Sequence, residues 1–166
     1  MNLKFTLERS DSKSAGDTAA FAFHGIKVAL MENGHPVSQA ADAKMFTEQW
    51  ISGQLVITTV RDLDIKATPE QPNIVGVQGY FVGPTIFGIT MGSPLGVFIM
   101  PPYRGKGLVG QLQDFTCEKM AGLKAHMAIH VCTKDGSLHK FLADERGVDF
   151  KYVLGYRDLR KQTDGS

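Results

Sequence analysis

The amino-acid sequence predicts an α/β (α+β) fold, and three observations support this. Residues 71 to 103 contain no charged side chain and are therefore expected to be mostly buried. Glycines recur through this stretch and disfavour a helix, whereas the β-branched and aromatic residues between them favour strands, so we expect a central hairpin. Apolar residues recur at helical spacing on both sides of it. The glycines and prolines also exclude a membrane-spanning helix there.

The N-terminal third is expected to contain one strand and two helices. Residues 3 to 7 form the first predicted strand. After a polar loop, Asp17 is expected to cap a helix with apolar residues at i, i+3 and i+7 from Phe23 onward. A strand over residues 26 to 31 is the open alternative. An Asn-Gly-His-Pro turn follows, and residues 38 to 51 are expected to form the second helix.

Inside the uncharged stretch, the apolar runs beginning at Ile74 and Val97 are the expected strands. Gly83-Pro84 and Gly92-Ser93-Pro94 are expected to mark turns. The helix after this stretch places five apolar residues on one broad stripe, which indicates one buried face. These residues are Leu108, Leu112, Phe115, Met120 and Leu123.

Residues 97 to 110 read as an apolar strand that passes through prolines into a basic glycine loop and then into a helix. Gly105 and Gly107 allow a tight turn and a close approach of the backbone to a ligand. The helix that follows presents unpaired N–H groups at its start, and Arg104 and Lys106 add positive charge. The segment therefore predicts an anion site, most simply a pyrophosphate site.

Two other glycine-rich phosphate loops fit less well. A Walker loop needs Ser or Thr after its lysine, but Lys106 is followed by Gly107. Residues 105 to 110 fit G-x-G-x-x-G, yet they lie too late in the chain for a dinucleotide-binding βαβ domain. A nucleotide-phosphate binder that uses the same loop stays open.

The run Pro101-Pro102-Tyr103-Arg104-Gly105-Lys106-Gly107 resembles the acetyl-CoA loop of the GCN5-related N-acetyltransferase (GNAT) superfamily. In that family a strand ends in P-x-Y-R-G-x-G, and the next helix holds the pyrophosphate of CoA. Residues 53 to 56, 60 to 62 and 75 to 76 are also similar to acetyltransferase-like proteins of tailed bacteriophages. The resemblance implies a GNAT-like mixed, mostly antiparallel central sheet of about six to seven strands, about four helices, and splayed fourth and fifth strands.

The resemblance also implies a domain layout, in which residues 1 to 160 form a single acyl-CoA N-acyltransferase-like domain and residues 161 to 166 a flexible tail. Size and composition agree with one domain, since the chain has 166 residues, of which 43% are hydrophobic and 21% charged. In the family's order, the implied elements are the third strand at 74–82, the fourth strand at 95–100, the CoA helix at 108–124, the fifth strand at 126–132, the fourth helix at 136–145 and the last strand at 151–159.

Acetyl-CoA is the implied cosubstrate, with no metal. By position, the Ile99 N–H would face the acetyl carbonyl, and Val109 stands where the family usually has a smaller residue. The residues implied to bind the cofactor are Phe98, Ile99, Met100, Arg104, Gly105, Lys106, Gly107, Leu108, Val109 and Gly110.

The proton carrier is the least defined part of the implied enzyme. The tyrosine common on the family's fourth helix is absent, because residues 141 to 143 read Phe-Leu-Ala. His130 and Cys132, which would share one face of the fifth strand, and Tyr80 on the third strand are the candidate catalytic residues. Further candidates are Tyr152, Tyr156 and a water chain to Asp62 or Glu48.

The expected function is transfer of an acetyl group from acetyl-CoA to a primary amine of a small molecule or protein. The alternative is a catalytically silent GNAT-fold binding module or a virion-associated interaction module. The formal net charge of +1 does not support nucleic-acid binding. Both cysteines, Cys117 and Cys132, are expected to be unpaired thiols in the cytoplasm, or in the host cytoplasm for a phage protein. No membrane partner is expected, and a homodimer is left open.

Overall fold

A computed structural model of the chain describes residues 1–35, 37, 42–68, 72–86, 88–129 and 143–144. The chain divides into two units, Met1–His130 and Val131–Ser166, and every helix and strand named below lies in the first. The predicted last strand, the tail and most of the predicted fourth helix fall outside the described residues. His130, Cys132, Tyr152 and Tyr156 fall outside them as well, so their roles and the single-domain boundary stay predictions.

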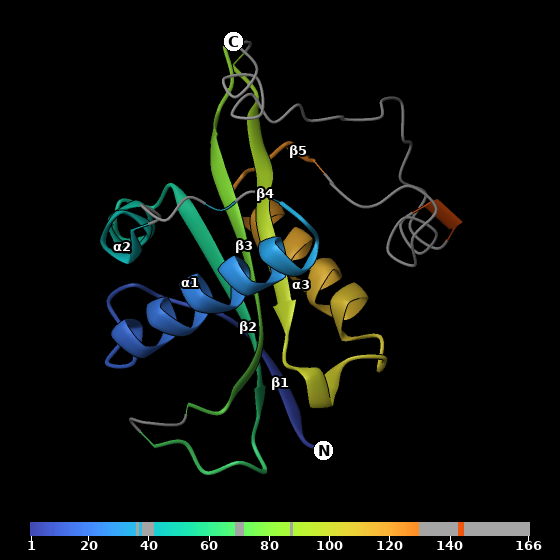
Figure 1. The fold of residues 1–166 in the computed structure, drawn as a ribbon. Coiled ribbons are helices and arrows are strands. Elements are labelled where there is room, and N and C mark those ends of the chain that lie inside the picture. The colour runs from blue at the N-terminus through green and yellow to red at the C-terminus, as the bar shows by residue number, and fades with distance from the viewer. Residues whose placement is uncertain (36, 38–41, 69–71, 87, 130–142, 145–166) are drawn as a thin grey trace, which may run out of the picture. The chain divides into compact units, whose positions relative to one another are not determined.

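A mixed, mostly antiparallel sheet forms the centre of the first unit, as predicted (Figure 1). Its strand order follows the chain, and each neighbouring pair is antiparallel except the last, which is parallel. The described part of the sheet has five strands, fewer than expected. The strands are β1 (Leu3–Leu7), β2 (Leu55–Asp62), β3 (Ile74–Pro84), β4 (Thr90–Ile99) and β5 (Met127–Ala128).

The described part of the chain has three α-helices that cover the sheet, with α1 (Ala15–Glu32) and α2 (Ala43–Ile51) on one face and α3 (Leu108–Gly122) on the other (Figure 1). On the α1 face, Ile26 and Trp50 pack with Val77 of β3 in one apolar cluster. On the α3 face, Leu112 packs with residues of β2 and β3 in a second cluster. Helices therefore cover both faces of the sheet, which explains why most residues of β2 and β3 are buried.

The helix boundaries correct two expectations. Asp17 does not cap α1, because the first helical hydrogen bond runs from Thr18 N–H to the Ser14 carbonyl and places Asp17 in the first turn. The alternative strand at residues 26 to 31 is wrong, since those residues continue α1. The second helix begins at Ala43, where the Asp42 carboxylate caps it by accepting from Lys44 N–H at 2.8 Å. Residues 38 to 41 lie outside the described part.

The predicted central hairpin is confirmed as β3 and β4. Gly83-Pro84, expected to mark a turn, lie inside β3 and pair with Met91 and Thr90, and Thr85 N–H donates to the Ile89 carbonyl just beyond them. Gly92-Ser93-Pro94 is not a turn, because these residues lie inside β4. The register shifts there, since Gly79 pairs with Gly96 and Tyr80 with Pro94, which leaves Leu95 as a β-bulge. Proline is tolerated at this point because its missing N–H falls where the ladder is interrupted.

The glycines of the hairpin let α1 approach the sheet closely. A Cβ at Gly96 would lie 3.0 Å from Ile26 Cγ2, and one at Gly79 would lie 3.1 Å from Ile26 Cδ1. Larger residues at either position would push α1 away from the sheet. Glycine recurrence in the uncharged segment therefore reflects helix packing as well as strand turns.

Candidate active site

The glycine loop has the backbone geometry that its sequence predicts. Gly105 and Gly107 have φ values of +75° and +71°, in the left-handed region that favours glycine. Gly107 is the N-cap residue of α3 and carries no side chain that could cap the helix. A Cβ at Gly105 would meet nothing within 4 Å, so the need for glycine there comes from the backbone conformation. The first amides of α3 are therefore presented at an open loop, which suits an anion.

Packing and a hydrogen bond anchor this loop at its two ends. Leu108, the first residue of α3, is only 4% exposed and packs in the cluster below the helix. Tyr103, just before the loop, donates a hydrogen bond from its hydroxyl to Asp62 Oδ2 at 2.7 Å. This bond lowers the pKa of Asp62 and raises the pKa of Tyr103. Asp62 is thus an ionised carboxylate bonded to the loop tyrosine, which is a structural role that the sequence did not reveal.

The two basic residues of the loop differ in their contacts. Lys106 Nζ lies 5.2 Å from the centre of the Tyr103 ring and 3.7 Å from Met1 Sδ. Arg104 forms an ion pair with Glu32, in which Nη2 lies 2.9 Å from Oε2. Its Nε also donates a hydrogen bond to the Ile99 carbonyl at 2.9 Å. Sequence reasoning assigned both residues to the cofactor, but in this structure the Arg104 guanidinium already binds protein groups.

Among the described residues, the edge of β4 next to the loop has no partner strand, and we call it the open edge. Met100 N–H donates to the Val75 carbonyl at 2.9 Å, so by the alternation of an antiparallel ladder the peptide groups of Val97 and Ile99 turn away from β3. On that side β5 pairs only with Met91 and Gly92, and no strand of the described part pairs with the edge beyond Gly92. This arrangement agrees with splayed fourth and fifth strands.

The open edge contains one of the three strand-end residues assigned to the cofactor. The Ile99 N–H faces it, whereas the N–H groups of Phe98 and Met100 turn toward β3. The Phe98 side chain lies beneath Arg104, whose Cζ is 5.7 Å from the ring centre. Val97 was missed by the sequence analysis, because the bulge at Leu95 sets which peptides face outward and no local pattern predicts that bulge.

Tyr80, a candidate proton donor, lies in a buried polar network beneath α3. It is 1% exposed, and its hydroxyl accepts a hydrogen bond from Gln113 Nε2 at 2.5 Å. Gln78 donates to Gln113 in turn, and Thr116 donates to Gln78 at 2.9 Å. Burial raises the pKa of Tyr80 well above its usual value, so the phenol stays protonated. Its catalytic role stays a prediction.

Cys117 lies beside this network, with its Sγ 3.7 Å from Gln113 Nε2. It is a free thiol, as predicted, and burial raises its pKa. Glu48, one of the two carboxylates considered for a water chain, is 3.8 Å from Lys44 Nζ on the exposed side of α2.

The start of β5 is fixed by His126, whose N–H donates to the Thr90 carbonyl at 2.8 Å while its ring Nδ1 accepts from Thr90 N–H at 3.1 Å. Met127 in β5 is 54% exposed. Leu123, expected in the buried stripe of the helix, is 49% exposed because α3 ends at Gly122 and Leu123 only caps it.

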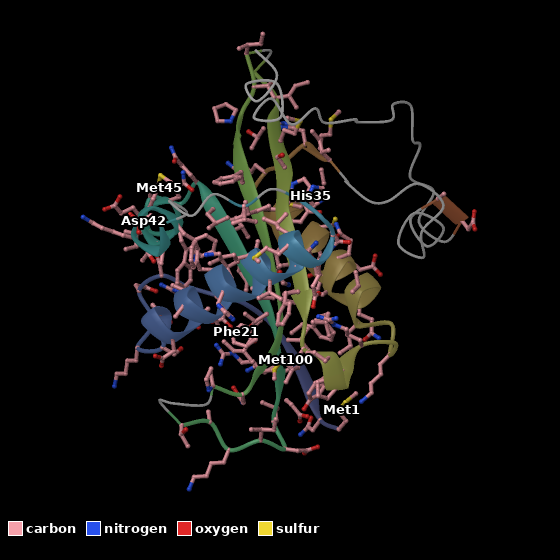
Figure 2. All side chains as sticks on the ribbon, viewed as in Figure 1. Met1, Phe21, His35, Asp42, Met45 and Met100 are labelled. Atoms are coloured by element: carbon pink, nitrogen blue, oxygen red, sulfur yellow. The ribbon has the colours of Figure 1, made fainter. Side chains whose placement is uncertain are left out.

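An apolar cavity of about 260 Å³ lies next to the residues that precede the loop. Phe21 of α1 and Met100 at the end of β4 both line it (Figure 2). Its lining does not include the open edge at Val97 and Ile99.

Among the described residues, no group of three or more His, Cys, Asp or Glu side chains could hold a metal ion. No helix of the described residues is long and apolar enough to cross a membrane.

Neither the models of protein families nor the curated protein sequences give a match to this chain. Its fold, in contrast, matches solved acetyltransferase structures. A Trypanosoma brucei acetyltransferase is 16% identical with a TM-score of 0.64, and the match covers 95% of this chain and 100% of that one. A predicted acetyltransferase from Clostridium acetobutylicum, solved with acetyl-CoA, is 14% identical with a TM-score of 0.65 over 96% of this chain and 97% of that one.

An aminoglycoside acetyltransferase from an uncultured soil metagenomic sample, solved with trehalose, is 11% identical with a TM-score of 0.66. That match covers 95% of this chain and 96% of the other. The chain therefore has the fold of the GCN5-related N-acetyltransferases.

Proposed function

We propose that the protein is an acetyl-CoA-dependent N-acetyltransferase that acts on a primary amine of a small molecule or protein. One observation carries the proposal: the left-handed glycine loop at the start of α3 lies next to the open edge of β4. A phosphate site that continues into an unpaired strand edge suits a ligand with a pyrophosphate at one end and amide groups further along. CoA is such a ligand.

Each part of the cofactor would meet a matching group of the chain. The pyrophosphate would accept hydrogen bonds from the first amides of α3 and attract Lys106. The amides of the pantetheine arm would pair with the peptide groups of Val97 and Ile99, as an added strand does at a sheet edge. Leu108, Val109 and Gly110 would contribute through their backbone, at the first turn of α3.

The reaction needs little special side-chain chemistry from the described residues. A neutral amine attacks the thioester carbonyl, a C–N bond forms, the C–S bond breaks, and the proton lost by the amine reaches the thiolate of CoA. A backbone N–H at the open edge would stabilise the developing oxyanion. His130, Cys132 and Tyr80 remain the proposed proton carriers, and burial keeps the Tyr80 phenol protonated.

The similar structures support an amine acceptor, since their names include aminoglycoside acetyltransferases and a glucosamine-6-phosphate N-acetyltransferase from Arabidopsis thaliana. A catalytically silent binding or virion-associated module is the second candidate. It is favoured by one observation, namely that β4 carries no titratable side chain. Residues 53 to 56, 60 to 62 and 75 to 76 resemble acetyltransferase-like proteins of tailed bacteriophages. We therefore propose that the protein is located in the cytoplasm, or in the host cytoplasm if a phage encodes it.

Release of free CoA thiol from acetyl-CoA, measured with a panel of primary amines, tests the function. The panel should hold an aminoglycoside, an amino sugar and a lysine-containing peptide. Amine-dependent thiol release that a loop substitution abolishes would support the enzyme. Acetyl-CoA binding without thiol release for any amine would favour the silent module, and binding of ATP in place of CoA would favour the nucleotide-phosphate alternative.

A further inference from the structure

The Glu32–Arg104 pair joins the last turn of α1 to the start of the glycine loop. Both Glu32 carboxylate oxygens lie near Arg104 Nη2, at 3.1 and 2.9 Å. The last turn of α1 contains no basic residue, and a negative charge at the C-terminal end of a helix is unfavourable. The positive charge of Arg104 therefore offsets the unfavourable interaction between the Glu32 carboxylate and the C-terminal end of α1.

The other contacts of Arg104 lie beside the open edge of β4. Its Nε donates to the Ile99 carbonyl at 2.9 Å, and its Cζ lies 5.7 Å from the centre of the Phe98 ring. The guanidinium is planar with donors in a fixed fork, so these three contacts together define its orientation. One side chain thus connects α1, the end of β4 and the loop.

Phe98 extends this connection into α1. Its ring packs edge to face on Phe21, with ring centres 6.2 Å apart. It also lies against Gly25, where an added Cβ would come within 2.7 Å of Phe98 Cδ1. Arg104 is therefore held over a ring that α1 itself fixes in place, and not over a mobile surface residue.

We infer that Glu32 and Arg104 are positioning residues for the acetyl-CoA site, an inference that rests on the proposed function. The pair holds the loop and the Ile99 peptide in the geometry that receives the cofactor. Arg104 acts through Ile99 and the loop backbone and is not a ligand of the pyrophosphate. The positive side-chain charge that faces the pyrophosphate then comes from Lys106. Glu32 was not singled out by the sequence, because only the fold brings α1 to the loop.

A double-mutant cycle on acetyl-CoA affinity, measured by calorimetry, tests the inference. Glu32→Gln should raise Kd about two- to fivefold, the upper part of the range expected for losing a half-exposed ion pair. In the Arg104→Gln background, Glu32→Gln should have no further effect. Arg104→Lys should behave like Arg104→Gln, because an ammonium lacks the planar fork. Lys106→Gln is the matched control, and its effect should add to that of Glu32→Gln.

Several results would overturn the inference. These are an unchanged Kd for Glu32→Gln, additive effects of Glu32→Gln and Arg104→Gln, or a loss of more than about 100-fold in Arg104→Gln alone, which would identify a direct phosphate ligand. The two side chains are 47% and 43% exposed, so the variants should fold, and thermal melting checks this. A wild-type protein that binds no acetyl-CoA would overturn the proposed function together with the inference. Wild-type binding with an unchanged Kd in Glu32→Gln overturns the inference alone.

Discussion

Gly107→Glu is the substitution that most clearly separates ligand binding from folding at the loop. Gly107 has φ = +71°, and a Cβ there would meet only Gln111 Nε2, at 3.8 Å, an ordinary contact distance. The structural cost is therefore the backbone strain of an L-residue in the left-handed region, about 1–2 kcal/mol. Gly53, two residues before β2, has φ = +76° and open space around it, so Gly53→Glu should carry the same strain at a different place.

The effect on binding should be larger than the effect on stability. A carboxylate at the N-cap position of α3 would lie near the bound pyrophosphate, and two like charges about 4 Å apart repel by about 1 kcal/mol in water and about 4 kcal/mol near a protein surface. These values correspond to a loss of affinity between about fivefold and about 1,000-fold. Gly107→Gln has the same shape without the charge and isolates the electrostatic part.

Calorimetry with acetyl-CoA and thermal unfolding of the same samples measure the two effects. Gly107→Glu and Gly53→Glu should lose similar stability, and only Gly107→Glu should lose acetyl-CoA affinity, more strongly than Gly107→Gln. Unchanged affinity in folded Gly107→Glu would refute the assignment of the loop as the pyrophosphate site.

Three further predictions concern packing, the buried network and proton transfer. Gly25→Ala should destabilise the protein by about 1–3 kcal/mol in urea unfolding, because its Cβ would lie 2.7 Å from Phe98 Cδ1; an unchanged midpoint would show that the ring can move. Tyr80→Phe should cost about 1 kcal/mol in urea unfolding, because it removes one buried hydrogen bond from Gln113 Nε2. The pKa of Tyr80 is higher in the folded protein than in the unfolded chain, where it is about 10. The free energy of unfolding of the wild type should therefore decrease as pH rises above about 10, and it should decrease less in Tyr80→Phe. The same pH dependence in both proteins would contradict this. If positioning and backbone polarisation carry most of the rate, His130→Ala should lower kcat by less than about 100-fold, and a larger loss would identify a catalytic residue.

The loop could be predicted from the sequence because its information is local. Glycines in the left-handed region, a helix start and two nearby cations all occur within a few residues, and Gly105 and Gly107 adopt the expected backbone. The uncharged stretch predicted the hairpin for a similar reason, since burial and strand propensity are properties of the segment itself.

What the sequence could not predict depends on contacts between distant elements. Arg104 was expected to face the cofactor, but the fold brings Glu32 to it from α1. Pro94 was expected in a turn, whereas the pairing with β3 places it at a bulge. Gln78 and Gln113 have no local signal for a shared hydrogen bond, and only the docking of α3 on β3 creates it.

Hydrogen exchange of backbone amides with and without acetyl-CoA tests the central claim most directly. If acetyl-CoA binds at the loop and along the open edge of β4, it should protect the first amides of α3 together with those of Val97 and Ile99. ADP, which has the pyrophosphate but no pantetheine arm, should protect only the first turn of α3. Protection elsewhere, or equal protection by both ligands at Val97 and Ile99, would contradict the account.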